Sequence, residues 1–270
     1  MKRFYIITNR TKDKDLEVTK RIKAYIESKG GECFSAEEYT YMPEKIDCIL
    51  VLGGDGTLIR AARELPSSDV PMLGINMGTL GYLTEVEVSD MEKSIDQLMD
   101  GDSYVEKRML LQGKVHGQDE SLALNDIVLT RSGNVRVIQF HVYVNGELLN
   151  TYRADGVIVS TPTGSTAYNL SAGGPIVAPT ASLIVITPIC SHALNTSSIV
   201  LSADDEIVLE VGLGRDGNVE EAVVSFDGEK DVIVHTGDTI QIRKAEATAK
   251  LLKLSKISFL EIMREKMKGN

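Results

Sequence analysis

CILVLGGDGTLIRAAREL, residues 48–65, is the stretch from which the fold of this chain can be predicted. Its first part, Cys48–Leu52, is an apolar run typical of a buried strand, and residues 57–65 have the periodicity of a helix. Between them lies the glycine-rich turn Gly53–Thr57. A strand, a glycine-rich turn and a helix in this order bring backbone N–H groups close to a phosphate. The stretch therefore predicts an anion site at the turn.

An aspartate, Asp55, stands in the middle of this turn. A carboxylate beside phosphates repels them unless a cation intervenes or the carboxylate has a chemical task. Acting as general base toward a hydroxyl that attacks a phosphoryl group is such a task. The alternative is a plain βα turn, because Asp-Gly and Gly-Gly pairs are common turn formers. The turn matches neither a P-loop nor the dinucleotide fingerprint, so the interpretation of Asp55 depends on partners elsewhere.

The surrounding pattern predicts an α/β domain over residues 1–102. Strands and helices alternate, with strands expected at 4–8, 48–52 and 71–76 and helices at 16–28, 57–65 and 89–100. Such alternation predicts a parallel sheet with helices on its faces. The glycine-rich turn then lies at the carboxyl end of a strand, where sheets of this kind bind their ligands.

From residue 103 onward the pattern changes to short strands, expected at 107–115, 121–131, 136–144, 156–160, 183–187, 198–201, 206–211, 222–226 and 239–243. The Asn145-Gly146 pair between two apolar runs predicts a hairpin. Many short strands in succession predict an all-β sandwich or closed β structure, which we place at residues 103–254. A last helix is expected at 259–267.

The densest run of small polar residues is STPTGSTAYNLSAGGP, residues 160–175. It follows the polar segment 152–156 and a short apolar run. Ser and Thr hydroxyls both donate and accept hydrogen bonds, which suits ribose and phosphate oxygens. The alternative is a solvated Ser/Gly loop. Tyr168, Leu170 and Pro175 would be out of place in a linker and argue against that alternative.

Two further motifs complete the set. Asn125 and Asp126 interrupt the apolar strand pattern of residues 122–129, and buried polar side chains need partners. Either the amide and carboxylate of the pair bind the polar edge of a base or of an amide-bearing ligand, or the pair marks a bulge or a strand end with an Asx turn. The glycine-spaced run GINMGTLGYL, residues 74–83, follows another apolar run.

In their order, these four motifs resemble those of NAD kinases, which phosphorylate the 2′-hydroxyl of the adenosine ribose of NAD. The resemblance covers residues 49–228 and implies an NAD kinase-like fold with Asp55 as the catalytic base. The residues that we expect to bind NAD are Gly56, Asn125, Asp126, Arg153, Asp155, Thr163, Thr166, Ala167, Tyr168 and Ser171. Those expected to bind the phosphoryl donor are Gly53, Gly54, Thr57 and Arg60.

The chain has a net charge of −10, so a phosphoryl donor needs a cation to neutralise the transferring group. The sequence shows no metal site of its own, and we expect Mg²⁺ or another divalent cation to arrive with ATP or polyphosphate. The resemblance implies that the segment of about 255–270 packs back on the first domain. Phe226-Asp227-Gly228 resembles a late family motif and is equally typical of a hairpin turn. Two departures are Asp126, where the family often has glutamate, and the absence of an Arg-Pro pair near Ser197.

Two other functions stay open. Lipid kinases of the diacylglycerol and sphingoid type carry a similar Gly-Gly-Asp-Gly-Thr turn, and a nucleotide sensor without catalysis is the third possibility. The Asn125-Asp126 pair and the run 160–175 favour a nucleotide over an acyl chain. The retention of Asp55 and its glycines speaks against the sensor.

Composition agrees with a cytoplasmic enzyme. A net charge of −10 over 270 residues, with pI near 5.0, argues against nucleic acid and anionic membranes as partners. The cysteines show no disulfide or zinc spacing, and Cys48 and Cys190 are expected to be small core residues. There is no signal-peptide pattern and no apolar stretch long enough to span a bilayer. We expect a homodimer or homotetramer.

Overall fold

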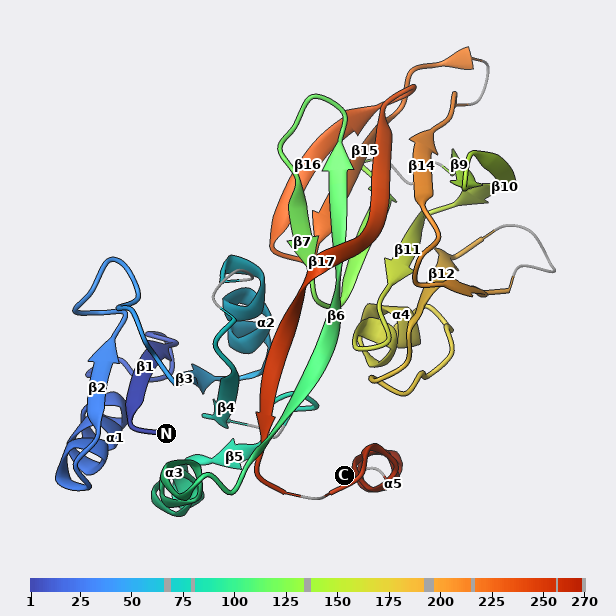
Figure 1. The fold of residues 1–270 in the computed structure, drawn as a ribbon. Coiled ribbons are helices and arrows are strands. Elements are labelled where there is room, and N and C mark those ends of the chain that lie inside the picture. Colours follow the sequence, from blue (N-terminus) through green and yellow to red (C-terminus); the bar gives the residue numbers. More distant parts are fainter. Residues whose placement is uncertain are drawn as a thin grey trace. The chain divides into compact units, whose positions relative to one another are not determined.

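The computed structural model describes the chain except residues 66–68, 79–80, 134–136, 192–196, 215–216, 256 and 269–270. The chain divides into two compact units (Figure 1). The first comprises Met1–Lys107 together with Ala249–Asn270, and the second comprises Arg108–Thr248. Two long strands that pair with each other, β6 (Tyr104–Val115) and β17 (Thr239–Lys253), contribute residues to both units.

The first unit is built on a parallel sheet. Its strands stand in the order β2 (Glu32–Ser35), β1 (Arg3–Thr8), β3 (Cys48–Gly53) and β4 (Met72–Asn76), with β5 (Val86–Glu87) and the end of β17 also parallel to β4. The helices of this unit are α1 (Glu17–Ser28), α2 (Asp55–Glu64), α3 (Met91–Asp100) after the 3-10 turn η1 (Val88–Asp90), and α5 (Phe259–Met267).

Side chains alternate across the sheet and place helices on its two faces. Leu50 of β3 belongs to one apolar core with Ile22 of α1 and Ile95 of α3. Leu58 of α2 packs instead against Gly74 of β4, where a Cβ would approach its side chain to 3.2 Å. The central strand β3 is buried along its whole length, as its continuous apolar run predicts.

The second unit consists of antiparallel strands in two layers. One sheet has the order β13 (Ile199–Ser202), β12 (Leu183–Ile189), β11 (Gly156–Ser160), β8 (Asp126–Arg131), β15 (Glu221–Phe226) and β16 (Lys230–His235). The other contains β10 (Glu147–Ala154), β9 (Ile138–Val144), β14 (Ile207–Val211) and the start of β17, with β6 and β7 (Ser121–Ala123). A short 3-10 turn η2 (Gly164–Thr166) and helix α4 (Tyr168–Ser171) follow β11.

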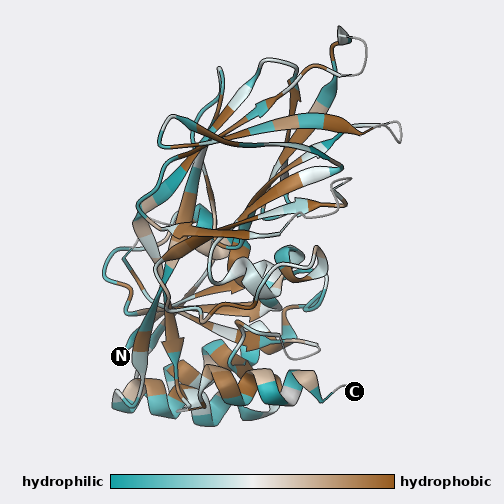
Figure 2. Cartoon of the chain, turned by 90° about the vertical axis from the view of Figure 1, so that its right-hand side faces the viewer, coloured by the Kyte–Doolittle hydropathy of each residue, from teal (hydrophilic) through white to brown (hydrophobic). Residues whose placement is uncertain are grey.

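A single apolar core joins these two sheets. Phe140 of β9 and Leu209 of β14 belong to it together with Leu129, Val157 and Phe226 of the six-stranded sheet. In Figure 2 apolar residues accordingly recur along the strands, whereas the helices carry both apolar and polar stretches. The predicted fold class, an α/β domain with a parallel sheet followed by an all-β sandwich, is confirmed.

Several elements differ from the sequence prediction. The expected strand 121–131 is interrupted at Leu124 and Asn125, which separate β7 from β8. Strands β2 and β16 were not predicted, and β17 extends ten residues beyond the expected end at residue 243. The extension contains Ala, Glu, Lys and Thr in place of a strong apolar alternation, so periodicity gave no signal there.

Two smaller observations complete the fold. Cys190 was expected in the core, but it is exposed at the end of β12 with a φ of 47°, because the chain turns there. Cys48 is buried as expected. Among the helices that the structure describes, none combines the length and the apolar character needed to cross a membrane.

Candidate active site

The glycine-rich turn joins β3 to α2 and places Asp55 at the first position of the helix. Gly54 is the N-cap residue in an extended conformation, and Asp55 lies in the first helical turn. A Cβ on Gly53 would overlap the side chain of Thr57, so only glycine allows this close approach. Unpaired N–H groups at a helix start favour negative charge, either of a carboxylate or of a phosphate.

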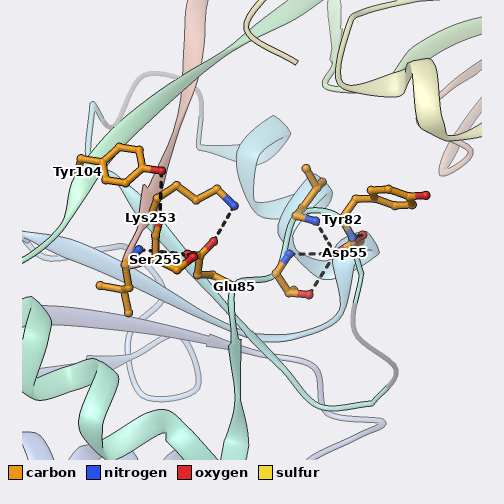
Figure 3. A network of polar contacts seen from close by, with 9 residues as sticks. Asp55, Tyr82, Glu85, Tyr104, Lys253 and Ser255 are labelled. Atoms are coloured by element: carbon orange, nitrogen blue, oxygen red, sulfur yellow. Dashed lines mark hydrogen bonds and ion pairs between the residues drawn. The ribbon is translucent and has the colours of Figure 1, made fainter. Parts of the chain in front are cut away.

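The Asp55 carboxylate is held by three consecutive backbone N–H groups (Figure 3). Oδ2 accepts from Tyr82 N at 2.6 Å. Oδ1 accepts from Leu83 N and Thr84 N, both at 3.1 Å, and from the Thr84 hydroxyl at 3.2 Å. A Cβ on Gly81 would overlap this carboxylate. Oδ1 is thus saturated with donors, whereas Oδ2 has one donor and keeps capacity to accept another proton or hydrogen bond.

Other predicted donor-binding residues lie around the same turn. Thr57 is buried, and its hydroxyl accepts from Asn9 Nδ2 at 3.1 Å, which ties the loop after β1 to the turn. Arg60 is exposed on α2. The sequence reasoning missed Lys12, whose exposed ammonium would lie 3.2 Å from a Cβ on either Gly54 or Gly78. A lysine within a charged loop carries no sequence signal of this proximity.

The Asn125-Asp126 pair lies in the second unit, where β8 begins. Its backbone is fixed by a carboxylate that was outside the predicted site, Asp227 in the turn between β15 and β16. Asp227 accepts from Leu124 N at 2.8 Å, Asn125 N at 2.7 Å and Asp126 N at 3.2 Å. In the sequence, the Phe226-Asp227-Gly228 pattern was the feature that pointed to Asp227. That pattern forms a hairpin turn, with φ of 52° at Asp227 and 69° at Gly228.

The side chains of the pair differ in their surroundings. Asp126 is buried, and burial together with the nearby Asp227 carboxylate raises the pKa of its carboxyl from 3.8 to about 7. Asn125 is half-buried, and its carboxamide forms no hydrogen bond with any residue that the structure describes. An Asx turn requires that carboxamide to accept a nearby backbone N–H. The side chain of Asn125 therefore does not form the Asx turn considered above within the described chain.

The polar run 160–175 is docked onto this strand break. Thr161 donates its hydroxyl proton to Leu124 O at 2.6 Å and its backbone N–H to Asn125 O at 2.8 Å. A Cβ on Gly164 would overlap the backbone of Asn125. Residues 160–165 are all buried, so this part is no solvated linker.

Two polar residues inside the run hold its shape. The Ser165 hydroxyl donates to Pro162 O at 2.7 Å and accepts from Val177 N at 3.0 Å. The Asn169 carboxamide donates to Pro175 O at 3.0 Å and accepts from the Thr187 hydroxyl at 2.6 Å. Both side chains are thereby fully engaged in shaping the loop.

The predicted NAD-binding residues of the run have different environments. Thr163 is buried and its hydroxyl accepts from Arg108 Nη1 at 3.3 Å, and the Thr166 hydroxyl donates to Thr163 O at 3.5 Å. Ala167 is half-buried, whereas Ser171 is exposed. The exposure of these residues therefore increases along the run from Thr163 to Ser171.

Tyr168 begins α4, and its side chain is partly exposed. Partial burial raises the pKa of its phenol, and Cys190, Asp126 and Asp155 add to this effect. Asp155 is paired with Arg131, with 2.8 Å between Oδ1 and Nε.

Arg153 lies apart from these contacts on β10. It is exposed, between the buried residues Tyr152 and Ala154, and it faces Gln139 of β9. The side-chain oxygen of Gln139 accepts hydrogen bonds from Arg153 Nη2 at 3.1 Å and from Arg153 Nε at 3.2 Å. Among the described residues, no group of three or more His, Cys, Asp or Glu side chains could hold a metal ion.

The comparisons with known proteins agree with the motifs. Residues 12–104 match the ATP-NAD kinase N-terminal domain, and residues 124–254 match the ATP-NAD kinase C-terminal domain. The NAD kinase of Lachnospira eligens is 47% identical over 293 residues, which cover 99% of this chain and 100% of that protein. The NAD kinase of Agathobacter rectalis is 48% identical over 282 residues, covering 100% and 99%.

Solved structures give the same result. An NAD kinase from Archaeoglobus fulgidus in complex with ATP has a TM-score of 0.78 at 26% identity and covers 98% of both chains. Yeast NADH kinase complexed with NADH has a TM-score of 0.82 at 23% identity, covering 100% of this chain and 88% of that one, a likeness of fold. The predicted resemblance is confirmed, and the chain belongs to the NAD kinase family of phosphotransferases.

Proposed function

We propose that this NAD kinase uses Asp55 as the general base that accepts the proton of the adenosine 2′-hydroxyl as NAD is converted to NADP. The observation that carries the proposal is the carboxylate at the start of α2, whose Oδ1 is saturated by Leu83 and Thr84 while Oδ2 keeps capacity to accept. Oδ1 anchors the side chain, and Oδ2, which among the described residues accepts only from Tyr82 N, would take up the proton.

Phosphoryl transfer depends mainly on positioning and on stabilisation of charge, and a base is needed only to take up the hydroxyl proton. The donor's phosphates would lie against the turn formed by Gly53, Gly54 and Thr57, with Arg60 as a nearby cation. Lys12 adds a second exposed positive charge close to Gly54 and supports the same placement.

NAD binding is proposed for the second unit, at Asn125 and Asp126. A carboxyl with its pKa near 7 can donate as well as accept a hydrogen bond at neutral pH, which suits a ribose hydroxyl or a base edge. The further residues proposed to contact NAD are Gly56, Arg153, Asp155, Thr163, Thr166, Ala167, Tyr168 and Ser171. The docking of run 160–175 on Asn125 supports a common site for most of them.

We propose ATP as the phosphoryl donor, since the Archaeoglobus relative was solved with ATP, and polyphosphate is the alternative. A triphosphate brings a divalent cation, preferably Mg²⁺, which is held largely by phosphate oxygens and water. That ion neutralises charge on the transferring group. No resident metal site of the protein is needed for this chemistry.

The enzyme is further proposed to be a cytoplasmic homodimer or homotetramer. Two edge strands of the second unit expose large apolar side chains, Val200 on β13 and Ile233 on β16, with relative exposures of 53% and 62%. Exposed apolar groups on edge strands favour association with another copy of the chain.

The test is a direct assay. Purified protein is incubated with NAD, Mg²⁺ and either ATP or polyphosphate, and NADP is detected with an NADP-specific dehydrogenase. We expect NADP formation with ATP and its loss on addition of a chelator, while the melting temperature of the protein alone stays unchanged. Phosphorylation of diacylglycerol or sphingosine without NADP formation would contradict the proposal and favour a lipid kinase.

A further inference from the structure

The segment that holds Asp55 is itself held by the end of the chain. Glu85 directly follows the donors Tyr82–Thr84, and its carboxylate lies 2.7 Å from the ammonium of Lys253 at the end of β17 (Figure 3). Its other oxygen accepts from Leu254 N at 3.2 Å, from Ser255 N at 2.9 Å and from the Ser255 hydroxyl at 2.7 Å.

This ion pair is buried. The side chains of Glu85 and Lys253 are 8% and 9% exposed. Burial opposes ionisation of the Glu85 carboxyl, but Lys253 and Ser255 outweigh that effect and lower its pKa. Removing one partner of a buried pair leaves an uncompensated charge, so the pair constrains its surroundings far more than an exposed pair does.

A second contact joins the same two segments. The ammonium of Lys266 in α5 lies 5.2 Å from the centre of the Tyr82 ring, within the range of a cation–π interaction. The backbone N–H of Tyr82 is the donor to Asp55 Oδ2. Tyr104 adds a bond from its hydroxyl to Ser255 O at 3.2 Å, which fixes the C-terminal segment in turn.

The segment is held on two sides, because Glu85 N donates to Gly74 O of β4 at 3.0 Å and the Glu85 carboxylate binds the C-terminal segment. Gly81 must remain without a Cβ because of its contact with Asp55, so no side chain can brace the chain at that point. Three N–H groups can converge on one carboxylate only while the backbone of residues 82–84 keeps one conformation. Glu85 lies at the end of this stretch, where its fixation limits the movement of all three donors.

We propose that the C-terminal segment, through residues 253–255 and α5, positions Asp55 by way of residues 82–85, with Glu85 and Lys253 as positioning residues that never touch the substrate. The inference rests on the proposed role of Asp55 as base. A displacement of a catalytic group by about 1 Å can lower turnover by about a hundredfold. Loosening the Glu85–Lys253 pair should therefore lower kcat and spare the binding of both substrates.

The experiment compares Lys253→Met with Lys250→Met. Lys250 lies on the same strand and in the same unit, but its ion pair with Asp69 is exposed on the Asp69 side. We expect Lys253→Met to lower kcat about 10- to 100-fold with both KM values within about twofold, and Lys253→Arg to restore most of it. Lys250→Met should leave kcat unchanged. Equal losses in both Met variants, or a loss confined to KM, would overturn the proposal.

A double variant separates this inference from the proposed role of Asp55. If Lys253 acts through Asp55, then Lys253→Met in an Asp55→Asn background should lower kcat no further, because the group being positioned is gone. Multiplying losses would show that Lys253 acts independently and would defeat the inference, even if Asp55 is the base. Near-normal turnover of Asp55→Asn alone would defeat the base and the inference together.

A milder variant covers the case in which Lys253→Met does not fold. Ser255→Ala removes one hydroxyl donor to Glu85 from a partly exposed position and keeps the ion pair. We expect kcat to fall about 3- to 10-fold with unchanged KM values, as removal of one hydrogen bond within the network predicts. Circular dichroism and the melting temperature check folding, and an unchanged kcat in the folded variant would contradict the proposal.

Discussion

The two units use the same arrangement for opposite purposes. In the first, Asp55 accepts from the backbone N–H groups of residues 82–84, and in the second Asp227 accepts from those of residues 124–126. Around Asp55 the backbone holds in place the carboxylate that we propose as the base. Around Asp227 the carboxylate holds in place the backbone of Asn125, which we propose to contact NAD. Three consecutive backbone N–H groups can thus either fix the position of a carboxylate or be fixed by one.

The largest expected effect tests the first half of this comparison. Asp55→Asn keeps a side-chain oxygen that can accept from Leu83 and Thr84 and loses the bond from Tyr82 N, so the turn should stay folded with one contact fewer. The amide cannot take up a proton, and we expect kcat to fall about 10²-fold or more, the usual scale for a general base. Turnover and melting temperature are measured together. Near-normal turnover with unchanged NAD binding would remove Asp55 from the mechanism.

The next effect tests the second half. Asn125→Ala should raise the KM for NAD roughly 5- to 150-fold, because a lost buried hydrogen bond costs about 1–3 kcal/mol. The KM for the donor should hardly change, since Asn125 and the Gly53–Thr57 turn belong to different units. Asn150→Ala, at an exposed position of β10, is the matched control.

A structural role of Asn125 would give another pattern. The melting temperature would then fall and both KM values would rise together, because a loosened β8 start would disturb the run 160–175 that is docked on it. Unchanged NAD kinetics in a folded Asn125→Ala protein would contradict the proposed contact with NAD.

The comparison also shows which parts of the molecule can be predicted from sequence. Strand β3 and helix α2 follow from an apolar run, glycines and helical spacing, and α5 has the predicted bounds of residues 259–267. These signals are local, since each reports the burial of one face of one element. The order of the motifs was enough to predict the family, because this order is read along the sequence and does not depend on which residues contact each other in the fold.

The contacts that the carboxylates of Asp227 and Glu85 make could not be predicted in the same way. Asp227 is 101 to 103 residues from its donors, and Glu85 is 168 residues from Lys253. Each residue alone is typical of a turn or of a charged surface. Their pairing depends on how strands are connected in the folded chain, and no spacing along the sequence records it.

The smallest expected effect concerns Asp126, which lies near the Asp227 carboxylate. Burial and Asp227 raise the pKa of its carboxyl from 3.8 to about 7. Between these two values the folded protein keeps a proton that the unfolded chain has released, so the free energy of unfolding falls as pH rises. This contribution is fully present below about pH 4 and is lost as the pH passes about 7.

Asp126→Asn removes this titration and keeps the shape of the side chain. Between about pH 5 and pH 8 the unsubstituted protein should lose about 1–3 kcal/mol more of its unfolding free energy than the variant does, as measured by urea denaturation. In Asp227→Asn the pH dependence should shrink but persist, because burial is the larger cause of the raised pKa and Asp227 the smaller. The same pH dependence with and without Asp126 would show that its carboxyl is already ionised at pH 5. The fold would then tolerate the neighbouring negative charges of Asp126 and Asp227.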